Sequence, residues 1–116
     1  QPTLRGCIDI PAAGATCDPR SFRVEGWVSG GDAHATIDAV ELWCRGACAG
    51  RTTKLFPRPD VNRVLALPAD VAPGFRLDAH LAQPPTGAAR LELRLIRRGA
   101  PPATVAFADV RFATGV

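Results

Sequence analysis

The fold is decided by the stretch SFRVEGWVS at residues 21–29, in which apolar and polar side chains alternate. Phe22, Val24, Gly26 and Val28 would point one way in an extended chain. Arg23, Glu25 and Trp27 would point the other way. Successive side chains of a strand leave opposite faces, so this period of two predicts a half-buried β-strand.

The same reasoning extends along the chain in both directions. Residues 75–82 alternate without a break, and Leu91, Leu93 and Leu95 share one side of the next alternating stretch. The phase slips near Ala39 and Val40, which predicts a β-bulge there. Six further strands are therefore expected, at residues 5–10, 36–44, 48–56, 75–82, 89–97 and 103–113.

Turn-forming residues separate these stretches. The chain contains 11 Gly and 11 Pro, gathered at residues 30–32, 73–74, 84–87 and 99–102, and this density disfavours long helices. Seven short strands with a turn signal between each are typical of an antiparallel immunoglobulin-like β-sandwich. We expect one such domain to fill residues 1–116. In the connector at residues 57–63, Asp60 is expected to cap a single helical or 3₁₀ turn.

Composition and charge exclude several classes of protein. With 47% hydrophobic and 22% charged residues, the chain is neither disordered nor a coiled coil. No apolar run approaches the roughly 20 residues that span a bilayer, so we expect no transmembrane segment. The net charge of +3 comes from scattered arginines without a basic stripe, which disfavours nucleic-acid binding.

The four cysteines suggest a compartment. Cys7 and Cys17 flank a loop that holds a Pro and a Gly, whereas Cys44 and Cys48 flank Arg45–Gly46–Ala47, a three-residue hairpin loop. We therefore predict the disulfides 7–17 and 44–48, and with them a periplasmic or secreted protein. One zinc site built from all four thiols, or four free thiols, are the alternatives; the wide first spacing disfavours zinc. Because the sequence begins with Gln1 rather than Met, we interpret it as a mature form or an excised piece.

Several stretches together resemble a known family. FRVEGWV is followed by IDAVEL at residues 37–42, by RPDV at residues 58–61 and by PGFRL at residues 73–77. This order resembles the immunoglobulin-like accessory domains that sit beside bacterial glycosyltransferase or methyltransferase domains, over roughly residues 20–95. The resemblance implies a non-catalytic module and no reaction.

Residues that could carry out catalysis are few. His34 and His80 are the only histidines, and Ser21 and Ser29 the only serines, without a Gly-x-Ser-x-Gly elbow. The carboxylates are dispersed rather than paired as in glycosidases, and no calcium-loop motif surrounds Asp32 or Asp38. We therefore predict no enzyme, no cofactor and no metal site.

Four residues are candidates for ligand binding: Trp27, Trp43, Arg58 and Asp60. Both Trp fall opposite the apolar positions of their strands, so together they could form a flat platform for sugar rings. The alternative is that one Trp, most simply Trp43 beside Cys44, packs in the core against a disulfide. Arg58 and Asp60 could serve a ligand loop or could simply pair with each other.

The sequence thus predicts a non-enzymatic, exported bacterial domain that binds a protein partner or a second copy of itself through its sheet edges and loops. The loops at residues 30–35 and 57–63 are the ones expected to make contacts. The alternative is a carbohydrate-binding module that uses the Trp platform with Arg51, Arg58 or Asp60.

Overall fold

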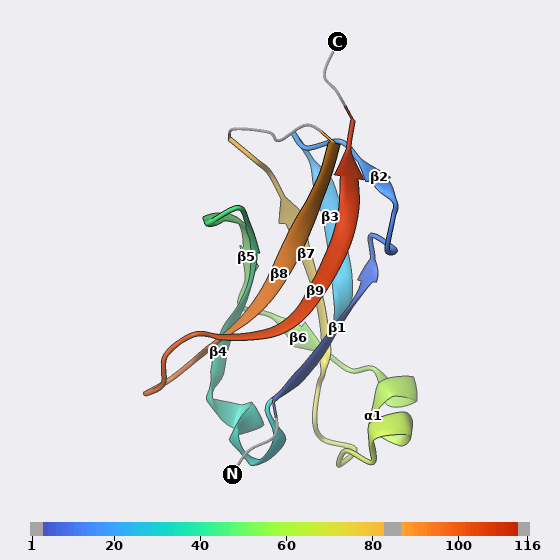
Figure 1. Cartoon of the computed structure of the whole chain (residues 1–116). Coiled ribbons are helices and arrows are strands. Elements are labelled where there is room, and N and C mark those ends of the chain that lie inside the picture. Colours follow the sequence, from blue (N-terminus) through green and yellow to red (C-terminus); the bar gives the residue numbers. More distant parts are fainter. Residues whose placement is uncertain (1–3, 83–86, 114–116) are drawn as a thin grey trace.

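Two β-sheets packed against each other form the molecule (Figure 1). The computed structural model describes residues 4–82 and 87–113, so most of the turn expected at residues 84–87 lies outside the described residues. The elements in chain order are β1 (Arg5–Ile10), β2 (Thr16–Cys17), β3 (Phe22–Ser29), the 3₁₀-helix η1 (Gly31–Thr36), β4 (Ile37–Cys44), β5 (Ala47–Thr52), β6 (Leu55–Phe56), α1 (Pro59–Leu65), β7 (Gly74–Ala79), β8 (Gly87–Arg97) and β9 (Ala103–Phe112).

The strand order is β1-β3-β7-β6 in one sheet and β2-β9-β8-β4-β5 in the other. Neighbouring strands run antiparallel except β2, which pairs parallel with β9. The sheets curl toward each other at their margins. On one side Gly6 of β1 lies against Val105 of β9, and on the other the His80 amide, just after β7, donates to the carbonyl of Ala49 in β5 at 2.8 Å.

The predicted all-β architecture is confirmed, but the expected number of seven strands is wrong. The described residues form nine. The two additional strands, β2 and β6, have two residues each, too short to show a two-residue period. The stretch 48–56, expected to form one strand, instead changes sheet: β5 ends at Thr52 and β6 pairs with β7 in the opposite sheet.

Inward-facing side chains of both sheets form the core. Leu42, Leu91, Leu93 and Leu95 are fully buried from the five-stranded sheet, and Phe75 is fully buried from the four-stranded sheet. The strand predicted at residues 21–29 is confirmed as β3, which begins one residue later, at Phe22; its inward positions are buried and Arg23 is exposed. The predicted bulge is also present, as a register shift between Ile37 and Ala39 where β4 pairs with β8. The hairpin loop is one residue shorter than expected: β5 begins at Ala47, and Arg45 and Gly46 both have positive φ.

Helix α1 follows from local sequence. Pro59 occupies the first turn, where its missing N–H costs nothing, and Asp60 lies near the positive end of the helix dipole. The helix ends at Leu65, because the next residue, Ala66, has a φ of +55° and the Leu67 amide donates to the Asn62 carbonyl. None of the helices formed by residues 4–82 and 87–113 is long and apolar enough to cross a membrane.

All four cysteines are free thiols, so the predicted disulfides are wrong. In the β4–β5 hairpin, Cys48 pairs with Trp43 and Cys44 with Ala47. Paired residues share a face of the sheet, so Cys48 lies on the outer face while Cys44 is buried in the core.

Cys7 and Cys17 are separated in the same way. Cys7 pairs with Trp27 on the outer face of the four-stranded sheet, whereas Cys17 belongs to the other sheet and packs into the core. The short spacing in sequence therefore does not bring the sulfurs together. Among the described residues, no group of three or more His, Cys, Asp or Glu could hold a metal ion.

Candidate functional site

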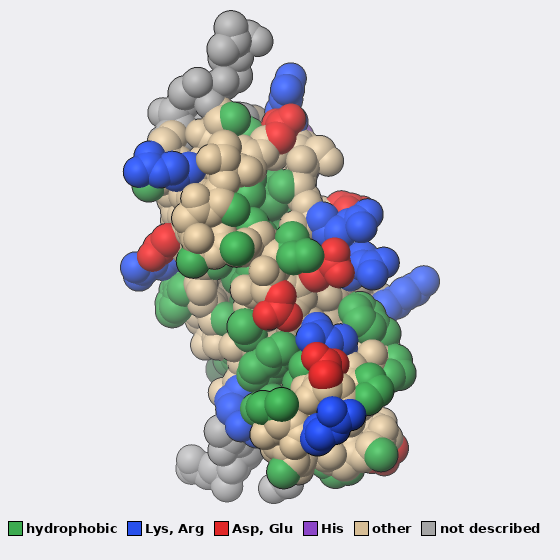
Figure 2. Space-filling view, turned by 90° about the vertical axis from the view of Figure 1, so that its right-hand side faces the viewer, with side chains coloured by type: hydrophobic (Ala, Val, Ile, Leu, Met, Phe, Trp, Pro, Cys, Tyr) green, Lys and Arg blue, Asp and Glu red, His purple; other side chains and the backbone are tan. Residues whose placement is uncertain are grey.

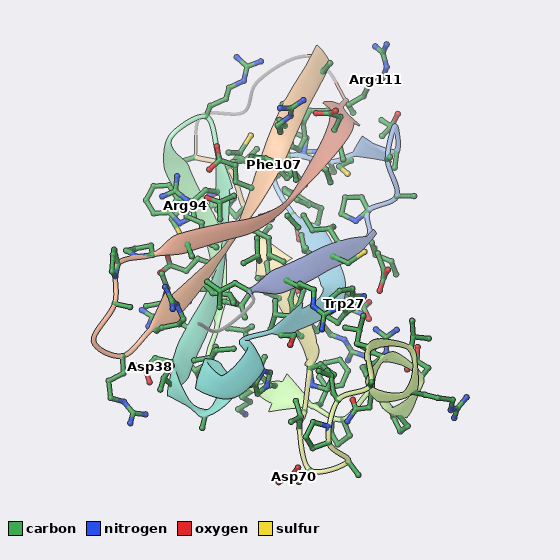
Figure 3. All side chains as sticks on the ribbon, turned by 60° about the horizontal axis from the view of Figure 1, so that its bottom comes forward. Trp27, Asp38, Asp70, Arg94, Phe107 and Arg111 are labelled. Atoms are coloured by element: carbon green, nitrogen blue, oxygen red, sulfur yellow. The ribbon has the colours of Figure 1, made fainter. Side chains whose placement is uncertain are left out.

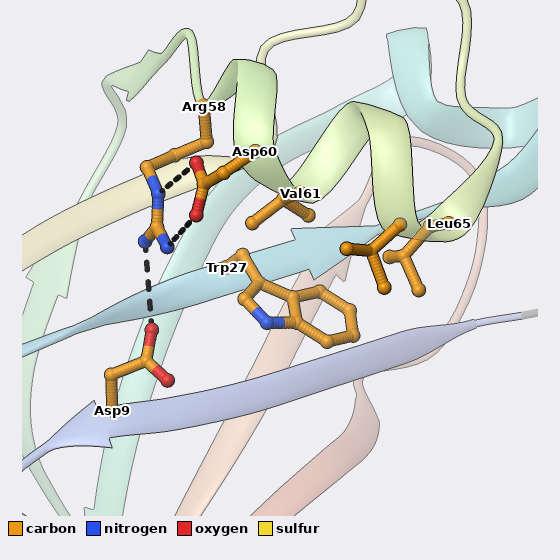
Figure 4. A pocket seen from close by; sticks show the side chains of 7 residues that line it. Asp9, Trp27, Arg58, Asp60, Val61 and Leu65 are labelled. Atoms are coloured by element: carbon orange, nitrogen blue, oxygen red, sulfur yellow. Dashed lines mark hydrogen bonds and ion pairs between the residues drawn. The ribbon is translucent and has the colours of Figure 1, made fainter.

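Three of the four candidate ligand residues line one pocket, although they come from distant parts of the chain. The Trp27 pocket is lined by Trp27, Arg58 and Asp60, together with the residues Asp9, Val61, Val64 and Leu65 (Figure 4). It has a volume of about 200 Å³. Trp43 does not take part.

The pocket forms where α1 lies over the outer face of the four-stranded sheet (Figures 1 and 4). Trp27 leaves β3 on that face, between Cys7 of β1 and Gly74 of β7. From the helix, Val61, Val64 and Leu65 supply the apolar wall; Val61 is buried, whereas Val64 is 82% exposed. The spacing i, i+3, i+4 places all three side chains on one side of a helix.

Charged groups line the other end of the pocket. The Arg58 guanidinium donates from Nε to Asp60 Oδ1 at 3.0 Å and from Nη2 to Asp60 Oδ2 at 2.8 Å. It also donates from Nη1 to Asp9 Oδ2, at a longer 3.5 Å. The side chains of Asp9 and Asp60 are 45% and 63% exposed, so both carboxylates keep oxygen lone pairs that face solvent. Asp60 does not act as the expected cap, since the capping position is Arg58, which makes no side-chain capping bond.

The ion pair keeps both partners charged. The hydrogen bonds from Arg58 lower the pKa of Asp60 from its ordinary 3.8 to about 2, helped by backbone N–H groups of the first helical turn. The same contact with Asp60 raises the pKa of Arg58, although partial burial of the guanidinium opposes this. A carboxylate with so low a pKa is a weak base near neutral pH. The pair is therefore suited to hydrogen bonding and charge recognition rather than to proton transfer.

Trp43 lies on the outer face of the opposite sheet. The guanidinium of Arg94 sits 4.2 Å from the centroid of its ring, and its indole N–H donates to Glu41 at 2.9 Å. The expected platform of two Trp is thus wrong, because the two indoles leave different sheets (Figure 3 labels Trp27 and the Arg94 that covers Trp43). Neither Trp is a core residue. Cys44, the neighbour of Trp43, occupies the buried position instead.

Both histidines bind backbone groups. The His34 Nδ1 accepts from the Gly30 amide at 3.2 Å, while its Nε2 lies 3.2 Å from the Ala72 carbonyl and donates to it. His80 contacts the carbonyl of Arg20 through Nδ1. Ser29 is buried and accepts from the Gly31 amide. These contacts give His34 and Ser29 a role in shaping the turn after β3.

Val61 lies in the loop 57–63 that the sequence predicts to make contacts, but three other residues of the pocket were not predicted. Val64 and Leu65 could have been found, since their helical spacing from Val61 follows directly on Pro59 and Asp60. No pattern in the sequence indicates Asp9. It contacts Arg58 because β1 pairs with β3, and a register shift in this pairing lies at Asp9, between Ile8 and Ile10.

The chain matches no protein-family model and no curated protein.

Proposed function

We propose that this chain is a non-catalytic binding domain and that the Trp27 pocket recognises a single sugar ring of a carbohydrate. The observation that carries the proposal is the meeting of Trp27, Arg58 and Asp60 in one open pocket. The sequence predicts a protein partner, with a carbohydrate as the alternative, and the geometry of the pocket favours the carbohydrate.

The chemistry of the pocket suits a sugar for two reasons. An indole offers an apolar surface to the C–H face of a sugar ring. Each sugar hydroxyl both donates and accepts hydrogen bonds, and the pocket provides both kinds of partner: spare guanidinium N–H groups on Arg58 and exposed oxygens on Asp9 and Asp60. The volume is below the roughly 300–1,000 Å³ typical of drug-sized ligands, which fits one ring rather than a larger molecule.

A protein partner is the second candidate, favoured by the exposed apolar side chain of Val64 at the pocket. Strand addition at a sheet edge, the expected mode, has less support. Of the four strands that end the two sheets, β2 and β6 have two residues each, and short edge strands resist pairing with another chain. The other two, β1 and β5, have six residues each and lie against β9 and β7 of the opposite sheet. Contact through the α1 side of the molecule is the better supported form of this proposal.

We also propose an immunoglobulin-like arrangement of the strands. The orders β1-β3-β7-β6 and β9-β8-β4-β5 correspond to the strand orders A-B-E-D and G-F-C-C′ of immunoglobulin domains. This correspondence concerns the fold, and the family resemblance of residues 20–95 stays a prediction. Export to the periplasm or beyond stays a prediction without support from the cysteines, because they are free thiols.

The carbohydrate proposal is tested by titrating the protein with neutral gluco-, manno- and galacto-oligosaccharides while recording tryptophan fluorescence and heat. Trp27→Ala should weaken binding by at least about tenfold, because an aromatic contact of this size contributes roughly 1.5–3 kcal/mol. Trp43→Ala is the matched control and should bind as the parent does. If no oligosaccharide binds, or if both variants lose binding equally, the proposal is wrong.

The protein-partner candidate calls for a different comparison. A partner recovered from an envelope fraction should be lost with Val64→Asp and retained with Phe107→Asp, because Phe107 is an exposed apolar residue on the opposite sheet. If both variants recover the partner equally well, the partner does not bind through the surface around α1.

A further inference from the structure

A second pocket lies on the same face as the Trp27 pocket. Thr52, Lys54, Phe56 and Arg76 line this cationic pocket, which has a volume of about 310 Å³. Phe56 pairs with Gly74 and Arg76 pairs with Glu25, so both side chains share the outer face of the four-stranded sheet with Trp27. The volume of the cationic pocket lies at the lower end of the roughly 300–1,000 Å³ that is usual for ligand sites.

Gly74 is buried beneath Arg58, which lines the Trp27 pocket, and Phe56, which lines the cationic pocket. In register, Trp27, Gly74 and Phe56 form one row across β3, β7 and β6. A Cβ on Gly74 would come within 2.7 Å of Arg58 Cγ and 2.5 Å of Phe56 Cε1, so the stem of Arg58 and the ring of Phe56 both occupy the space that a side chain would fill. With strands about 4.8 Å apart, Trp27 and Phe56 stand roughly 10 Å from each other. Two linked sugar rings span such a distance.

The two pockets differ in charge. The Trp27 pocket holds two carboxylates and one guanidinium, whereas the cationic pocket is lined by Lys54 and Arg76 and no acid. The guanidinium carbon of Arg76 lies 5.8 Å from the centroid of the Phe56 ring. Arg76 Nε also pairs with Glu25 Oε1 at 3.5 Å, and this single contact leaves other guanidinium N–H groups for a ligand. Within residues 4–82 and 87–113, Lys54 forms no ion pair. Figure 2 shows basic, acidic and apolar side chains close together on the α1 side of the molecule.

We infer that the carbohydrate is acidic: one ring stacks on Trp27, and an adjoining unit places a carboxylate against Lys54 and Arg76. This inference rests on the proposed function, because it extends the Trp27 pocket to a second subsite. Charge complementarity selects the occupant. A carboxylate would meet repulsion from Asp9 and Asp60 in the first pocket and attraction in the second, which also sets the direction of the chain.

The test uses matched probes: oligosaccharides of two to four hexose units, and the same oligosaccharides oxidised at C6 to uronic acids. The acidic form should bind the parent protein roughly five- to tenfold more tightly, as expected for charge-assisted hydrogen bonds at a partly exposed site. Lys54→Gln with Arg76→Gln should remove this advantage, so that the acidic and the neutral probe bind the variant with similar affinity. The advantage should also shrink as salt is added, because exposed charges are screened.

The outcomes separate the two proposals. Equal affinity for neutral and acidic probes, with no effect of the double variant, overturns the acidic subsite and leaves the Trp27 pocket standing. An acidic preference that survives the double variant also overturns it. Binding of glucuronate monomer that depends on Lys54 and Arg76 but not on Trp27 would show an isolated anion site and contradict the joined ligand. If no probe of either kind binds, both proposals fail.

Discussion

Arg58 and Asp60 form a two-point ion pair across the start of α1, with donor–acceptor distances of 3.0 and 2.8 Å. Because the two residues are only two positions apart, these two hydrogen bonds depend on the local backbone at the start of α1. Asp9 then adds a longer contact from β1. The polar end of the pocket is thus formed mostly by residues close together in sequence, whereas its apolar end forms only where α1 packs over β3.

This pair makes the stability of the protein depend on pH in acid. The pKa of Asp60 is about 2 in the folded protein against its ordinary 3.8, so its contribution is present above pH 3.8 and is lost as the pH falls through 2. The difference in unfolding free energy between the parent and Asp60→Asn, measured in urea, should stay constant from neutral pH down to about pH 5 and then shrink toward pH 2. A difference that does not change over this range would contradict the ion pair.

Gly74→Ala should damage the binding face rather than the core. The added methyl would meet the Phe56 ring and the Arg58 stem, so both of these half-buried side chains on the outer face of the sheet would have to shift. We expect a folded protein with at least severalfold weaker carbohydrate binding, measured by titration. Gly14→Ala is the control: its φ of +81° makes Ala costly, but a Cβ there would contact nothing, so it should lower stability and leave binding intact.

The thiols should differ in reactivity. Burial raises the pKa of Cys17 and Cys44, and burial together with the nearby Asp9 charge raises that of Cys7. Cys48 is exposed. Titration of the native protein with a thiol reagent should therefore show one fast thiol, which Cys48→Ser removes, and four reactive thiols after denaturation without reductant. Fewer than four reactive thiols in the denatured, unreduced protein would show that a disulfide is present and would contradict the structure.

Asn62 should hold the segment that follows α1. Its Nδ2 donates to the carbonyls of Pro68 and Val71 at 2.8 and 3.0 Å. Asn62→Ala leaves both without this donor, at a cost of about 1–3 kcal/mol in unfolding free energy measured in urea. Arg63→Ala, an exposed change on the same helix, should stay within about 0.5 kcal/mol. Equal values for the two variants would argue against this role of Asn62.

Leu93→Ala should destabilise the core by about 2–5 kcal/mol, because the side chain is fully buried between the sheets. Phe107→Ala removes a larger side chain from the neighbouring strand but one that is 57% exposed. It should cost less than Leu93→Ala. Thermal and urea unfolding would compare them, and the reverse order would contradict the inward and outward assignment of β8 and β9.

Local patterns in the sequence determined the faces of the strands. The period of two placed Val24, Leu77 and Leu93 in the core, and the phase slip in residues 36–44 located a real bulge, because side-chain direction in a strand depends only on neighbouring residues. The pairing of Arg58 with Asp60 was also within reach, since it spans a single helical turn.

Only the tertiary structure decided which distant residues meet. The cysteines were expected to pair because they are close in sequence, yet the alternation of β4 and the register of the β4–β5 hairpin send Cys44 inward and Cys48 outward. Trp27 meets Asp9 and Val61 rather than Trp43, because strand order and the path of α1 set those neighbours. A strand's sequence specifies its two faces, but the pairing of strands and the closing of loops select the partner for each face.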